Sequence, residues 1–173
     1  KEEKLKKLLQ GVSVKGFGEL NAKLAINDIR MNGDILALDA ILEADKTLQA
    51  TRDEYSFRPD MYKFMIEHAD AGTQKEIIRK YLAIMQEKQD VADERSNGKV
   101  TLFTENAYDI LAIGYYRLGD KKKSEACAKK FDEYYKLRLV DMKKMFKDEK
   151  TQAQIDDEYR QRMNDLHEKI GMK

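Results

Sequence analysis

The sequence has few residues that form disulfides or interrupt helices, with one cysteine and one proline among 173 residues. It has no tryptophan. A single cysteine, Cys127, excludes a disulfide within the chain and a zinc site built from several cysteines. We predict that Cys127 is a small core residue rather than a nucleophile. No apolar run approaches the roughly 18 residues that cross a bilayer, so no integral membrane segment is expected.

An excess of charge of one sign is also missing, since 33 Lys and Arg face 32 Asp and Glu. Without a net field, nothing in the overall composition attracts a phosphate backbone or an anionic membrane. Lysines do concentrate between positions 121 and 147, but acidic residues are interspersed among them. This mixture is typical of a solvated helix face, and no nucleic-acid partner is expected.

Residues for catalysis or metal binding are few. The only histidines are His68 and His167, and Met65 and Asn164 stand three positions before them, where a di-iron bundle would have Glu. Residues Gly16-Phe17-Gly18 lack the third glycine of a nucleotide-binding fingerprint. We therefore expect no enzyme activity, no metal and no cofactor, and we predict that His68 is a core histidine rather than an acid or base.

What the chain does contain favours helices. It is 42% hydrophobic and 38% charged, a composition that can bury a core while keeping outer helix faces solvated. With one proline to interrupt them, those helices can be long. The predicted fold class is all-α in a single domain.

Three short breaks divide the chain into helical hairpins. They are centred on Gly33, Gly72 and Gly119. Asp34 follows the first glycine and can cap the next helix, whereas Thr73 with Glu76 has the spacing of a capping box. The predicted organisation is a lead-in segment at 1–18, three helical hairpins at 19–150 and a C-terminal capping helix at 151–173.

Each glycine is flanked by apolar or small residues at helical spacing, which predicts two buried stripes facing each other. Around Gly33 and Gly72 the stripes are Ala22, Ala25, Ile26, Ile29, Leu38, Leu42 and Asp45, then Met61, Phe64, Met65, His68, Ile77, Tyr81 and Ile84. Around Gly119 they are Tyr108, Leu111, Ala112, Tyr115, Ser124, Ala128 and Phe131. The pattern predicts antiparallel hairpins.

The two ends of the chain also carry helical patterns. Leu5, Leu8 and Leu9 lie on one side of a short basic segment, which we interpret as a lead-in rather than a membrane-surface anchor. At the other end, Thr151 and Gln154 have capping-box spacing, and an apolar stripe follows. Its members are Ile155, Tyr159, Met163, Leu166 and Ile170. Such a narrow stripe is typical of a helix that closes a stack.

The third hairpin, Ala107 to Phe131, resembles a tetratricopeptide repeat. The match comprises the early aromatic, the Leu111-Ala112 pair, Tyr115 and the Gly-Asp turn. Ser124 stands where the family usually has Ala, and no proline closes the repeat. The turn glycines are 39 and then 47 residues apart, against about 34 in the family. The resemblance implies a short tetratricopeptide-like solenoid of stacked antiparallel hairpins, with another antiparallel helical bundle as the alternative.

In that family the first helix of each repeat lines a concave binding face. The resemblance therefore implies a partner-binding face made of Lys23, Asn27, Arg30, Tyr62, Ile66, Asp109, Ile113 and Tyr116. Lys23 and Asn27 match the spacing of the family's carboxylate-gripping variant, and Arg30 can add a bidentate contact. An ordinary exposed polar face is the alternative reading.

The leading functional hypothesis is a non-catalytic interaction or scaffold module that holds an acidic, partly apolar peptide or helix on this face. The alternative is a ligand-sensing or enzyme-associated domain, in which Tyr62, His68, Tyr115 and Tyr116 surround a small molecule between hairpins. The chain starts at Lys1 rather than Met, so we expect removal of a leader or a larger N-terminal part. Either a cytoplasmic protein or an extracytoplasmic part of a processed protein fits this sequence.

Overall fold

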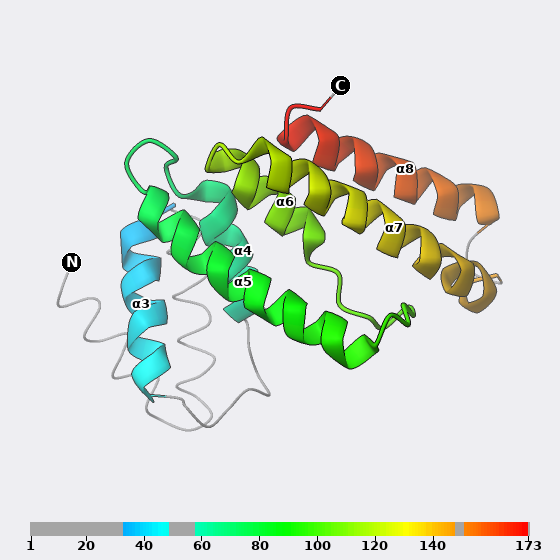
Figure 1. Cartoon of the computed structure of the whole chain (residues 1–173), viewed down its shortest axis with the longest axis horizontal. Coiled ribbons are helices and arrows are strands. Elements are labelled where there is room, and N and C mark those ends of the chain that lie inside the picture. Colours follow the sequence, from blue (N-terminus) through cyan, green and yellow to red (C-terminus); the bar gives the residue numbers. More distant parts are fainter. Residues whose placement is uncertain (1–32, 49–57, 148–150, 173) are drawn as a thin grey trace. The chain divides into compact units, whose positions relative to one another are not determined.

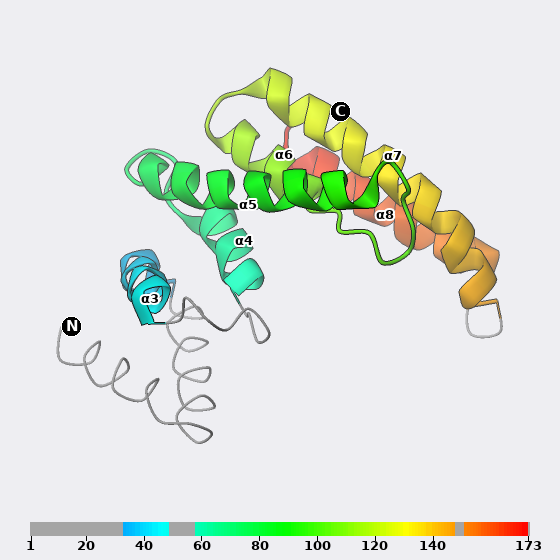
Figure 2. The same ribbon diagram turned by 60° about the horizontal axis from the view of Figure 1, so that its bottom comes forward.

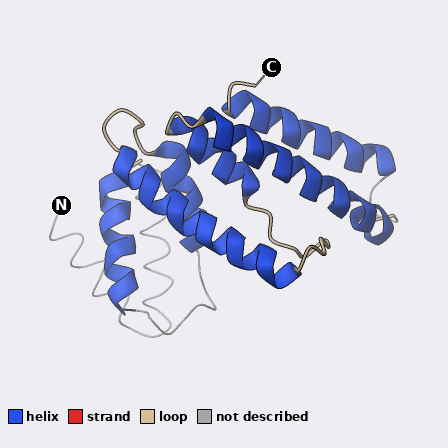
Figure 3. Cartoon of the chain, in the orientation of Figure 1, coloured by secondary structure: helices blue, strands red, loops and turns tan. Residues whose placement is uncertain are grey.

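The computed structural model describes residues 33–48, 58–147 and 151–172, and all regular structure in this part is helical (Figure 3). The chain forms two compact units that divide between Ala69 and Asp70. The expected lead-in segment at 1–18 and the first helix of the first hairpin lie outside the described residues. No helix in the described ranges combines the length and apolarity that a membrane crossing requires.

The first unit contains helices α3 (Ile35–Leu48) and α4 (Arg58–His68), which pack against each other. Asp34 caps the first turn of α3 as expected, because its Oδ1 accepts a hydrogen bond from Ala37 N at 3.1 Å. Helix α3 follows Gly33, which has a positive φ of 66°. The buried side chains of this unit are Ile35, Leu38, Leu42, Met61, Tyr62, Met65, Ile66 and Ala69.

His68 corrects one expectation, because its side chain is exposed rather than in the core. The ring lies 4.4 Å from the ring of Phe64, measured between centroids. His68 is the last residue of α4, where the helix ends and one face of the stripe opens to solvent. Of the stripe predicted around Gly72, Met61, Met65 and Tyr81 are buried. Its other members are half-buried or, for His68, exposed: Phe64, Ile77 and Ile84 are half-buried.

The second unit contains α5 (Lys75–Ser96), α6 (Tyr108–Arg117), α7 (Lys121–Met145) and α8 (Gln152–Lys169). Each helix packs on the next, and α8 also packs on α6 (Figures 1 and 2). The core is made of Ile78, Tyr81, Leu82, Met85, Tyr108, Ile110, Leu111, Ala112, Ala128, Phe131, Ile155, Met163, Leu166 and Ile170. Burial of this apolar set is the main source of the unit's stability.

The predicted turn between α6 and α7 is present. Gly119 has a positive φ of 87°, and Asp120 caps α7 by accepting a hydrogen bond from Lys123 N at 3.1 Å. Ser124 is buried, and its hydroxyl donates to the Ala112 carbonyl oxygen at 2.7 Å. This bond explains why a polar residue is tolerated where the repeat family usually has Ala, since a buried hydroxyl needs a partner.

The two capping boxes have different outcomes. The one at Thr151 and Gln154 is confirmed, with both reciprocal hydrogen bonds formed. The one at Thr73 is wrong, because α5 begins after Gln74 and has no side-chain cap. Asp70 organises this turn instead: its Oδ1 accepts from Gly72 N at 2.8 Å and from Thr73 N at 2.7 Å. The hydrogen bond from Thr73 N is the main reason that the pKa of Asp70 is lowered.

The contacts fix the direction of α6, α7 and α8. Near the turn Ser124 meets Ala112, and farther away the rings of Tyr108 and Tyr134 lie 5.3 Å apart, so α6 and α7 are antiparallel. Helix α8 runs back along α7. It is parallel to α6, because Asp109 near the start of α6 pairs with Arg162, and Tyr116 near its end approaches Gly171.

Candidate partner-binding surface

The residues implied as a concave binding face divide between the two units. Lys23, Asn27 and Arg30 lie outside the described residues. Tyr62 and Ile66 belong to the first unit and are both buried, with Ile66 showing no exposed surface. A side chain without exposed surface offers no contact to a partner, so these two positions act as core in this structure.

The other three positions lie along α6, next to α8. Asp109 Oδ2 pairs with Arg162 Nη2 at 3.2 Å, and Ile113 is buried. At the end of α6, a Cβ added to Gly171 would come within 2.8 Å of the Tyr116 hydroxyl. Helix α8 therefore approaches the α6 residues that the family resemblance assigned to a partner.

Tyr115, one of the aromatic residues of the small-molecule hypothesis, has an internal role. Its hydroxyl donates to Gln86 Oε1 on α5 at 2.9 Å, and the Lys123 ammonium lies 5.3 Å above its ring. Burial is the main cause of the raised pKa of Tyr115. These contacts join α5, α6 and α7, so the residue serves packing between helices.

The single cysteine matches its predicted role. Cys127 is buried on α7, and burial raises the pKa of its thiol to about 11. A thiol with that pKa is almost wholly protonated at neutral pH and is a poor nucleophile. No group of three metal-binding side chains occurs in the part of the chain that the structure describes.

A different surface arises from the unequal lengths of α6 and α7. Helix α6 has 10 residues and α7 has 25. Tyr108, the first residue of α6, already faces Tyr134, so residues 135–145 extend beyond the end of α6. This overhang is about 16 Å of helix. Helix α8 accompanies it, as shown by the Lys143–Asp156 pair at 2.7 Å, but no extension of α6 covers its other side.

The overhang displays apolar side chains. Leu137, Val140 and Met145 are 53%, 55% and 53% exposed, and Phe103 from the preceding loop is 83% exposed. We call these four residues the overhang surface. Phe103 and Met145 line one groove together, whereas Leu137 and Val140 are exposed on the same helix outside the lining of that groove. The sequence analysis did not predict the exposure of these four side chains.

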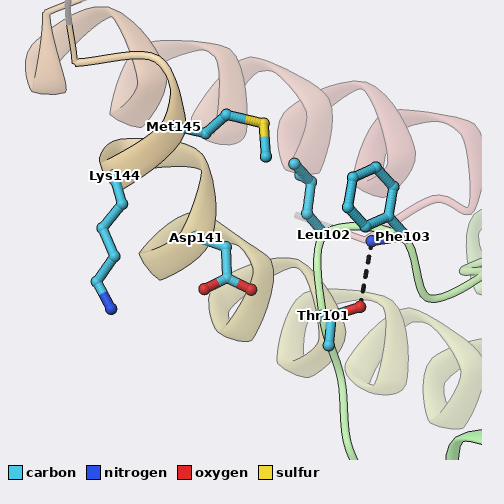
Figure 4. A pocket seen from close by; sticks show the side chains of 6 residues that line it. All are labelled: Thr101, Leu102, Phe103, Asp141, Lys144 and Met145. Atoms are coloured by element: carbon cyan, nitrogen blue, oxygen red, sulfur yellow. Dashed lines mark hydrogen bonds between the residues drawn. The ribbon is translucent and has the colours of Figure 1, made fainter.

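The loop that carries Phe103 is held by hydrogen bonds. Thr101 N donates to Thr104 Oγ1 at 2.8 Å, and Thr104 N donates to the Thr101 carbonyl oxygen at 3.1 Å. Phe103 N donates to Thr101 Oγ1, as Figure 4 shows. Arg138 ties the loop to α7, since its Nη2 donates to the Leu102 carbonyl oxygen at 2.8 Å. Phe103 is therefore presented on an organised turn.

An open groove of about 510 Å³ lies between this loop and the overhang. Thr101, Leu102 and Phe103 form one side, and the α7 residues Asp141, Lys144 and Met145 form the other (Figure 4). The lining is mostly apolar with one acidic and one basic side chain. Such a groove suits an apolar segment of a macromolecule better than a small polar substrate.

A polar cluster fixes α7 at the start of the overhang. The carboxylate of Asp93 on α5 accepts hydrogen bonds from the hydroxyls of Tyr108 and Tyr134, the latter at 2.9 Å, and from Gln89 Nε2 at 2.8 Å. Gln89 Oε1 in turn accepts from Ala107 N at 2.7 Å. The cluster links α5, α6 and α7, and its donors and acceptors are used in holding those helices together.

This cluster predicts a loss of stability in alkali. Burial, and then the hydrogen bond to Asp93, raise the pKa of Tyr108 above the ordinary tyrosine value of about 10. The unfolded chain releases the Tyr108 proton near that value while the folded chain retains it, so the contribution is intact below pH 10 and is lost as pH rises further. Tyr108→Phe should reduce the slope of the free energy of unfolding above about pH 10 by up to about 1.4 kcal/mol per pH unit. Urea unfolding at several alkaline pH values measures it, and an unchanged slope would show that Tyr108 ionises freely.

Comparisons with known proteins add no relative. No protein-family model matches the chain, and neither a curated protein nor a solved structure matches it.

Proposed function

We propose that this chain is a non-catalytic helical interaction domain and that it binds an apolar segment of another protein chain at the overhang surface. The observation that carries the proposal is Phe103, which is 83% exposed on a hydrogen-bonded turn and lines the groove together with Met145, which is 53% exposed. Covering apolar area stabilises a complex by about 25 cal/mol per Å² before the costs of association. An organised aromatic residue loses little freedom when it binds, so more of this gain is retained.

The proposed partner segment is a short amphipathic helix. The overhang spans about three helical turns, and the loop residues 101–103, rather than a helix, face it across the groove. A helix with apolar residues at intervals of three or four could lie there beside α7 and contact Phe103 with its end. The acidic peptide expected on the face of Lys23, Asn27 and Arg30 remains a separate prediction outside the described residues.

We also propose that α6, α7 and α8 form a tetratricopeptide-like stack. Two features support this arrangement: α6 and α7 make an antiparallel hairpin through Gly119, and α8 returns parallel to α6 and packs on it. In a helical solenoid the first helix of a following repeat occupies that position. Helix α8 would then be the capping helix of the stack, with its apolar stripe inward.

Peptide selection tests the proposed binding surface. A display library of peptides of about 16 residues, long enough for several helical turns, would be selected on the full chain. We expect the enriched peptides to share apolar residues at helical spacing and to bind Phe103→Ser/Leu137→Ser at least about tenfold more weakly, because central aromatic and aliphatic contacts dominate such interfaces.

The matched control is Leu36→Ser, which alters a residue on α3 that is 63% exposed and does not belong to the overhang surface. Peptides selected on the original chain should bind this variant with unchanged affinity. Equal binding to the double variant and to the original chain would reject the overhang surface as the binding site.

A further inference from the structure

The turn that ends α5 contains an Asn-Gly pair in a left-handed conformation. Asn97 has a φ of 48° and a ψ of 42°, and among the described residues it is the one residue other than glycine with a positive φ. Gly98 follows with a φ of 77°, and Lys99 N donates to the Ser96 carbonyl oxygen at 2.9 Å. The two central residues of this β-turn are therefore both left-handed, which suits Asn followed by Gly.

This turn leaves unbonded the two groups of the pair that can react with each other. Asn97 and Gly98 are both exposed. Within the described residues, neither the Asn97 carboxamide nor the Gly98 N–H forms a hydrogen bond, because the N–H of Lys99 closes the turn instead. Gly98 also has no Cβ to hinder its nitrogen, and glycine accepts the backbone rotation that brings this nitrogen toward the carboxamide.

The other two described asparagines are held in ways that oppose the same approach. The nitrogen that follows Asn106 is that of Ala107, and it donates to Gln89 Oε1 at 2.7 Å. Asn164 lies within α8, where the hydrogen bonds of the helix engage the next N–H. The structure thus distinguishes Asn97 from both of these asparagines by the freedom of the nitrogen that follows it.

We propose that Asn97 is a site of spontaneous modification, at which the chain converts this asparagine into isoaspartate or aspartate with water as the only co-reactant. The Gly98 nitrogen forms a bond to Asn97 Cγ, and Nδ2 leaves as ammonia together with the proton that the Gly98 nitrogen gives up. The product is a five-membered succinimide. Water then opens this ring: attack at the main-chain carbonyl carbon of Asn97 gives isoaspartate, and attack at Cγ gives aspartate.

The modification changes the chain where α5 joins the loop of the groove. Both products carry a carboxylate that is ionised at neutral pH. In isoaspartate the main chain also continues through Cγ, which adds a carbon atom between the cap of α5 and Lys99. The Lys99 carbonyl oxygen accepts a hydrogen bond from Thr104 Oγ1 at 3.4 Å. The altered turn therefore directly precedes the loop that carries Phe103.

Peptide mapping of the full chain tests the site. Folded protein and protein unfolded in guanidinium chloride would be incubated side by side at mildly alkaline pH, and trypsin would then release residues 96–99. We expect Asn97 to convert in the folded chain at a rate within about fivefold of its rate in the unfolded chain, because the turn holds neither reacting group. Asn106 and Asn164 should convert at least about tenfold more slowly in the folded chain than in the unfolded chain.

Two substitutions separate the chemistry from folding. Asn97→Gly removes the carboxamide and places at the left-handed position the residue that adopts it most readily, so it should abolish conversion and leave the circular dichroism unchanged. Gly98→Ala adds a methyl group beside the attacking nitrogen. It should slow conversion of Asn97 at least about tenfold in the unfolded chain, where the turn contributes nothing.

The rates and the product can each overturn the inference. A slowing of Asn97 by more than about fivefold on folding would show that the turn protects the pair. Protection of Asn106 no greater than that of Asn97 would show that the freedom of the following nitrogen is not what matters. Aspartate without isoaspartate would exclude the succinimide, and a protease that cuts before aspartate but not before isoaspartate distinguishes the two products.

Discussion

Leu111→Ala is expected to lower the free energy of unfolding of the second unit by about 3–5 kcal/mol, because it leaves a cavity in the core of that unit. Leu111 is completely buried, and Phe131, its neighbour in the predicted stripes, is 3% exposed. Phe131→Ala should therefore cost a similar amount. Urea unfolding followed by circular dichroism measures both changes.

Leu137→Ala provides the matched control, since it makes the same chemical change on α7 at a side chain that is 53% exposed. Its cost should stay within about 0.5 kcal/mol. A loss below about 1 kcal/mol for Leu111→Ala would place this residue outside the core and contradict the packing of α6.

Removal of α8 from Thr151 onward should cause association into species larger than a dimer. The helix contributes the buried side chains Ile155, Met163, Leu166 and Ile170, so its loss exposes the apolar faces of α6 and α7. Exposed apolar area of this size drives aggregation. Light scattering of the shortened chain over a range of concentrations measures the effect.

A variant of the full chain keeps this prediction testable if the shortened chain does not fold. Leu166→Ser places a hydroxyl at a buried position of α8, whereas Gln161→Ser makes an equivalent change at an exposed one. The first should lower the unfolding temperature by several degrees and the second should not. A shortened chain that remains a stable monomer would show that α8 is peripheral to the unit.

The all-helical class and much of the second unit could be predicted from the sequence because periodicity reports burial directly. Tyr108, Leu111, Ala112, Ala128 and Phe131 were all assigned to facing stripes and are all buried. The burial of Ile155, Met163, Leu166 and Ile170 in the α8 stripe followed from the same 3.6-residue pattern. Gly119 and Asp120 marked their turn because few other residues satisfy its positive φ and its cap.

The remaining features depend on neighbours that periodicity does not identify. His68 has the spacing of the predicted buried stripe, yet it is exposed. It lies at the end of α4, where burial depends on whether another part of the chain covers the helix end. Asp70 displaced Thr73 in organising the turn before α5, because one carboxylate oxygen satisfied several donors that a capping box would have divided. The overhang surface could be predicted only by comparing the lengths of α6 and α7. That comparison depends on where α6 starts, and a sequence places a helix start such as Tyr108 only to within a few residues.

The short length of α6 leaves part of α7 exposed, which lowers the stability of the isolated chain but leaves a surface for binding. If helix-forming residues replaced the loop before Tyr108, an extended α6 would lie along the face of α7 that continues from Tyr134 to Arg138 and Met145, within the same molecule. The altered chain would bury, within one molecule, apolar area that we propose a partner covers, so we expect it to be more stable in isolation and to bind that partner less tightly. Stability and recognition compete at this place in the chain, as they do where proteins retain exposed apolar residues for binding. Substitutions at residues 101–107 are therefore expected to give a more stable domain that binds its proposed partner more weakly.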